Sequence, residues 1–80
     1  MDGKLSRKPG VAGRFKVSGS TLYGWIRKGY MVRPIRLGPN TSAWLDKELD
    51  QILEARTAGA SDLEVQALVA RLHSARAVTA

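Results

Sequence analysis

Residues 17–28 combine hydroxyl, aromatic and basic side chains at helical spacing. Ser18 is a suitable N-cap, because its hydroxyl can accept a hydrogen bond from a backbone N–H of the next turn. Gly29 is the residue type that commonly ends a helix, so the sequence predicts a helix over about 19–28. Leu22, Trp25 and Ile26 form its apolar stripe. The cap residue and the outer side chains could bond base edges in a major groove, or phosphates: they are Ser18, Ser20, Thr21, Tyr23, Arg27 and Lys28.

A second basic group follows this helix. Arg33 and Arg36 flank Pro34 at the start of a predicted two-stranded hairpin, which turns at residues 38–40. A narrow minor groove attracts arginine, and phosphate contact explains the same residues equally well. Asn40 and Ser42 near the tip could bond phosphate or supply turn chemistry.

The remaining periodicity predicts three more helices. The first opens at Lys8-Pro9-Gly10, buries Val11, Ala12 and Phe15, and breaks at Lys16-Val17. Another spans about 47–57, with Asp46 as its N-cap. The last spans about 62–77 and begins with the S-x-x-E pattern of a capping box at residues 61–64. The expected core also contains Trp44, Leu49, Ile52, Leu53, Val65, Leu68, Val69 and Leu72.

Charge is distributed unequally along the 80 residues. Residues 1–40 contain nine Lys/Arg and one acidic residue, which gives +8, whereas residues 41–80 contain four Lys/Arg and six acidic residues, which gives −2. A basic half of this kind favours a polyanionic partner such as nucleic acid. Arg14 and Lys16 lie at the end of the first helix, where a helix that precedes a reading helix crosses the DNA backbone.

Composition argues against several classes of protein. There is no cysteine, which leaves no disulfide or thiolate metal site. No apolar run approaches the roughly 18 residues of a membrane span, and no secretory signal is evident, so a cytoplasmic location is expected. No nucleophile–base pair, metal cluster or phosphate loop indicates an enzyme, a cofactor or a small-molecule ligand. His73 is the single histidine, and we expect it to be solvated.

The segment from Val11 to Leu53 resembles the AlpA family of prophage regulators, which are small relatives of MerR-type and excisionase-type DNA-binding domains. The resemblance covers about residues 8–57. At the positions of Gly19 and Gly24 that family often has basic residues, and at the position of Lys16 it often has glycine. The matching residues are Val11-Ala12, Arg14-Phe15, the run from Val17 to Tyr23, the run from Pro34 to Gly38, and Ala43-Trp44-Leu45.

The resemblance implies a mainly α winged helix-turn-helix with a small β-hairpin and an extra C-terminal helix. We expect a flexible basic segment at 1–7, a DNA-binding domain at 8–58, and a helix within 59–80 that packs on the domain or mediates self-association. Helix 19–28 would read the major groove, and the wing at 32–45 would contact the flanking backbone or minor groove.

Several functions fit this expectation. The first is a phage or prophage transcriptional regulator that binds a specific double-stranded DNA sequence, as a homodimer or a cooperative multimer on DNA. The second is an excisionase that bends DNA for a site-specific recombinase. A third, from another class, is a small terminase-like phage assembly protein that carries a helix-turn-helix.

Overall fold

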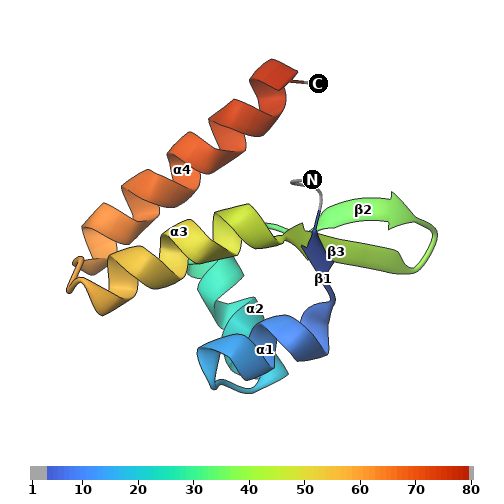
Figure 1. Ribbon diagram of the computed structural model, residues 1–80, viewed down its shortest axis with the longest axis horizontal. Coiled ribbons are helices and arrows are strands. Elements are labelled where there is room, and N and C mark those ends of the chain that lie inside the picture. The colour runs from blue at the N-terminus through green and yellow to red at the C-terminus, as the bar shows by residue number, and fades with distance from the viewer. Residues whose placement is uncertain (1–3, 80) are drawn as a thin grey trace.

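The computed structural model describes residues 4–79, and the side chains of residues 4–76. The chain is mainly helical with a small antiparallel sheet, as the sequence predicts (Figure 1). The elements in chain order are β1 (Leu5–Ser6), α1 (Lys8–Phe15), α2 (Gly19–Lys28), β2 (Ile35–Gly38), β3 (Thr41–Leu45), α3 (Asp46–Thr57) and α4 (Asp62–Thr79).

Local capping chemistry sets the bounds of α2. The Ser18 hydroxyl accepts a hydrogen bond from the Thr21 backbone N–H at 3.1 Å, and Gly29 ends the helix with φ 84°. Lys16 provides the tight turn between α1 and α2 in the left-handed conformation, with φ 60°. The predicted bounds of this helix and its cap are therefore confirmed.

The sheet has the order β1–β3–β2, with antiparallel pairing on both sides of β3. Ile35 lies opposite Ala43 in the predicted hairpin, and Asn40 has φ 61° in its turn. Strand β1 was not predicted. It lies within the segment 1–7 that we expected to be flexible, and residues 1–3 lie outside the described residues.

The prediction that Asp46 caps α3 is wrong. Leu45 occupies the N-cap position, because it ends β3 with the extended backbone that a cap requires, and no side-chain hydrogen bond completes this cap. Asp46 lies in the first turn, where its carboxylate accepts a hydrogen bond from the Ser6 hydroxyl. The carboxylate thus ties α3 to β1, and a negative charge in a first turn also suits the helix dipole.

Helix α4 packs against α3 and completes the core. Ser61 and Glu64 form the predicted capping box, with bonds of 2.8 and 3.2 Å. In Figure 1, α4 lies on the other side of α3 from α1 and α2, and the β2–β3 hairpin extends from one end of the helices. The core cluster contains Val11, Leu22, Met31, Val32, Trp44, Leu49, Ile52, Val65, Val69 and Leu72.

Membrane-spanning helices are not found in the described residues, since none of the helices is both long and apolar enough.

Candidate nucleic-acid interface

The outer face of α2 is exposed and polar. Leu22 is fully buried while Trp25 and Ile26 are half-buried, so the helix turns its apolar stripe inward as predicted. The Ser18 hydroxyl also donates to the Thr21 hydroxyl at 3.1 Å, so these two side chains are partly occupied by capping. The predicted residues on α2 that are exposed are Ser20, Thr21, Tyr23, Arg27 and Lys28.

Arg27 reaches back along this outer face. A Cβ placed on Gly24 would lie 3.9 Å from a terminal nitrogen of the Arg27 guanidinium. Since side chains of a helix lean toward its N-terminus, the guanidinium lies over the preceding turn, and the missing side chain of Gly24 leaves that space open. The positive charge is therefore nearer the middle of the helix than the position of Arg27 in the sequence indicates.

The hairpin presents a second set of predicted residues. Arg33, Arg36 and Asn40 are exposed, and Ser42 is half-buried directly across the strands from Arg36. The pairing between β2 and β3 shifts register between Arg36 and Gly38, which is an irregularity of the kind that re-aims side chains. Both arginine side chains are open to a partner, Arg33 on the segment that leads into the hairpin and Arg36 on strand β2.

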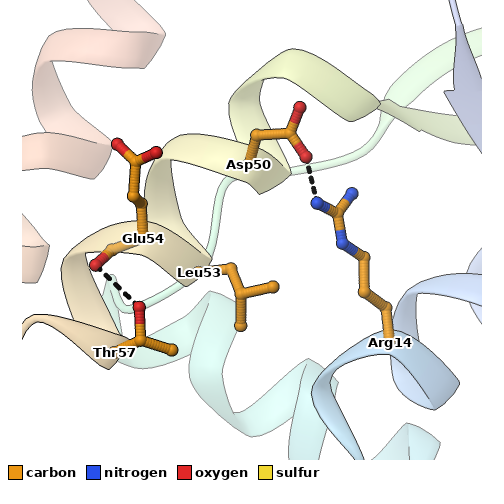
Figure 2. A pocket seen from close by; sticks show the side chains of 5 residues that line it. All are labelled: Arg14, Asp50, Leu53, Glu54 and Thr57. Atoms are coloured by element: carbon orange, nitrogen blue, oxygen red, sulfur yellow. Dashed lines mark hydrogen bonds and ion pairs between the residues drawn. The ribbon is translucent and has the colours of Figure 1, made fainter.

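Arg14 and Lys16 differ in their surroundings. Arg14 extends from α1 to Asp50 on α3, where the two side chains form an ion pair across a shallow groove (Figure 2). Leu53, Glu54 and Thr57 line the rest of this groove. Lys16 is exposed in the turn between α1 and α2. Arg14 is therefore paired with a carboxylate, whereas Lys16 has no carboxylate partner among the described residues.

Two hydrogen bonds from α4 fix the segment between α2 and the hairpin. The Gln66 amide donates to the Lys28 carbonyl at 2.8 Å, and His73 Nε2 accepts from the Arg33 backbone N–H at 3.1 Å. Our expectation of a solvated histidine is met only in part, because His73 is half-buried and accepts a hydrogen bond that was not predicted. Its burial, together with Arg33 and Arg76 nearby, lowers its pKa from the usual 6.5. A neutral imidazole is the form that can accept this bond.

Lys8 is a candidate residue that was not predicted from the sequence. Its ammonium lies 4.9 Å from the centroid of the Tyr23 ring, on the exposed face of α2. Gly19 beside it gives no local signal, since a Cβ there would be in ordinary van der Waals contact with the end of Lys8. The contact itself depends on how α1 crosses α2, which single-sequence periodicity does not give.

Basic residues near α1, α2 and the hairpin are largely unpaired. The ion pairs among residues 4–76 are Arg14–Asp50, Arg56–Asp62 and Arg76–Glu48. Of the nine Lys/Arg in residues 1–40, Arg14 alone takes part, so the other eight keep their charge unneutralised by any described carboxylate. Groups of three or more His, Asp or Glu that could hold a metal ion are not found in that same part of the chain.

No known family, curated protein or solved structure matches the chain in the comparisons made. The resemblance to AlpA regulators therefore rests on the residues quoted above, and the function implied by it stays a prediction.

Proposed function

We propose that the chain is a sequence-specific double-stranded DNA-binding protein that acts as a phage-type or prophage-type transcriptional regulator. The observation that carries the proposal is the set of eight basic residues in the N-terminal half that no described carboxylate neutralises. A surface of this kind gains free energy by displacing the counterions that surround duplex DNA.

In this proposal α1, the turn at residues 16–18 and α2 form a helix-turn-helix, and the β2–β3 hairpin is its wing. Helix α2 enters the major groove with Ser20 and Thr21 near base edges, because recognition helices usually meet bases through their N-terminal residues. These side chains are short, so direct reading of bases is limited. Arg36 on the wing then contributes preference through the width of the flanking minor groove.

The first test is binding-site selection from random duplex DNA, followed by affinity measurements over a range of salt concentrations. Contact by four to six basic residues predicts a log–log slope of roughly −4 to −5. A slope near zero would contradict a polyanionic partner. A selected site beside a recombinase attachment site, rather than at a promoter, would favour the excisionase function for the same surface.

The second test separates the roles of α2 and the hairpin. We expect Arg36→Ala to weaken binding by ~1–3 kcal/mol and to relax the preference for an A·T-rich flank. Arg27→Ala should cost a similar amount on all sequences, as loss of a phosphate contact does. Arg71→Ala, at an exposed position on α4, is the control and should change little. If Arg27→Ala alone removed the flank preference, α2 would be the reader and the role given to the hairpin would be wrong.

A further inference from the structure

The side chain of Lys8 crosses from the first turn of α1 onto the first turns of α2. A Cβ on Gly19 would lie 3.6 Å from Lys8 Cε and 3.7 Å from Lys8 Nζ, which are ordinary van der Waals distances, so the end of the lysine packs beside this glycine. The ammonium also lies over the Tyr23 ring, with Nζ 4.9 Å from the ring centroid. Lys8 of α1 thus contacts two residues of α2, Gly19 and Tyr23.

This ammonium has no carboxylate partner in the described residues. Neither α1 nor α2 has an acidic residue in its first turn, and the three ion pairs lie elsewhere. Ordering a lysine side chain costs conformational entropy, and contact with an aromatic face offsets part of that cost. The result is an exposed positive charge that lies against Gly19 and the Tyr23 ring, at the N-terminal end of α2 that the proposed function places at DNA.

We propose that Lys8 binds a backbone phosphate of the duplex beside α2, and that Tyr23 is a positioning residue whose ring holds the Lys8 ammonium. The inference rests on the proposed function and adds to it a residue from outside the predicted set. Lys8 supplies from α1 a positive charge that Gly19 itself does not provide. Tyr23 then acts through its ring, and its hydroxyl is dispensable.

The first experiment compares two lysine variants by fluorescence anisotropy on the selected duplex. Lys8→Met should lower affinity about 5- to 10-fold near ~0.1 M salt and reduce the magnitude of the log–log slope by about 0.9, as loss of one phosphate contact does. Lys47→Met removes the same charge from an exposed position on α3, near Leu72 of α4, and should change neither quantity. Lys8→Arg keeps the charge and should keep the slope.

The second experiment tests the positioning role with a double-mutant cycle. Tyr23→Leu should lower affinity about 2- to 5-fold, the equivalent of one exposed cation–π contact, whereas Tyr23→Phe should bind as the unchanged protein does. In the Lys8→Met background, Tyr23→Leu should cause no further loss, because the two residues act as one unit. Thermal unfolding of each variant checks that the fold is retained.

The outcomes distinguish a failure of the roles given to Lys8 and Tyr23 from a failure of the proposed DNA-binding function. Equal effects of Lys8→Met and Lys47→Met in a protein that binds DNA would overturn the role of Lys8 and leave the proposed function standing. Additive losses from Lys8→Met and Tyr23→Leu, or a loss from Tyr23→Phe, would overturn the positioning role of the ring. Failure of the unchanged protein to bind any duplex would overturn the proposed function, and this inference with it.

Discussion

At the scale of single residues, the ion pair between Arg14 and Asp50 determines whether one basic side chain is available. The Asp50 side chain is 61% exposed, so the pair contributes less than about 1 kcal/mol to stability. Arg14 is nevertheless held toward α3 by this contact (Figure 2). In the intact protein it therefore contributes less to binding an anion than its charge alone would indicate.

We expect Asp50→Asn to raise affinity for duplex DNA about 2- to 5-fold at low salt, because it removes a competing negative charge and frees the Arg14 guanidinium. Stability should fall by less than about 1 kcal/mol. The matched control is Asp62→Asn, which breaks the exposed pair with Arg56 and should leave DNA affinity unchanged. An equal gain from both variants would indicate a general effect of net charge instead.

At the scale of elements, α4 links α2 to the hairpin through the bonds that Gln66 and His73 make. The His73 bond requires a neutral imidazole, and burial is the main cause that lowers its pKa. The groups that face it are Arg33, Arg76 and Glu48; the two arginines lower the pKa further, and the carboxylate opposes them. Protonation of His73 would remove the acceptor for the Arg33 backbone N–H.

The titration of His73 should therefore make the free energy of unfolding depend on pH. A histidine with a lowered pKa in the folded state binds fewer protons than in the unfolded chain, so its contribution is full above about pH 6.5 and is lost as the pH falls through the folded pKa. Denaturant unfolding between about pH 5 and 8 measures this. His73→Gln, which keeps an acceptor but does not titrate, should flatten the profile over that range. An unchanged profile in His73→Gln would rule out the assignment to His73.

Helix ends that depend only on residues close by in the sequence could be predicted from the sequence. The cap at Ser18, the glycine at 29 and the capping box that begins at Ser61 are all local hydrogen-bonding patterns, and each was placed correctly. Asp46 was misassigned because the strand before α3 supplies the extended N-cap residue, Leu45. Strand β1 has two residues and pairs with β3 about forty positions away, so no local pattern marks it.

The candidate site was predictable only in part, for the same reason. Exposed residues on α2 follow from helical periodicity, and their exposure agrees with the predicted face. The positions of Lys8 against Tyr23, and of Arg14 against Asp50, depend on how α1 packs on other helices. His73 accepts a hydrogen bond from the backbone N–H of Arg33, which lies forty residues away in the sequence. Contacts of this range need the folded chain.

At the scale of the whole molecule, α4 is part of the one core. Val65, Val69 and Leu72 belong to the same buried cluster as Leu22 and Trp44. The helix also brings Arg76 to Glu48, which is 4% exposed and bonded through both carboxylate oxygens. Removal of one partner from a buried ion pair costs about 3–5 kcal/mol, and a domain of this size has little stability to lose.

A chain that ends at Gly59 should therefore lose its cooperative thermal transition, because it lacks part of the core and leaves the Glu48 charge unpaired. Circular dichroism against temperature measures this. The control is Leu63→Ala in the full chain, which alters the most exposed of the large apolar side chains described and should leave the transition unchanged. A truncated chain with the original transition and only weaker DNA binding would show that α4 serves the interface instead.

The two indoles of the chain lie in contrasting surroundings and provide separate optical signals. Trp44 is 2% exposed and donates through Nε1 to the Val32 carbonyl at 2.9 Å, whereas Trp25 lies half-buried on α2, edge-on to Phe15. In Trp25→Phe, emission should stay at short wavelength until the protein unfolds, because Trp44 alone remains. Any change in emission that the unchanged protein shows on adding duplex DNA should then disappear. The same spectrum of the natural chain thus records unfolding through Trp44 and events at α2 through Trp25.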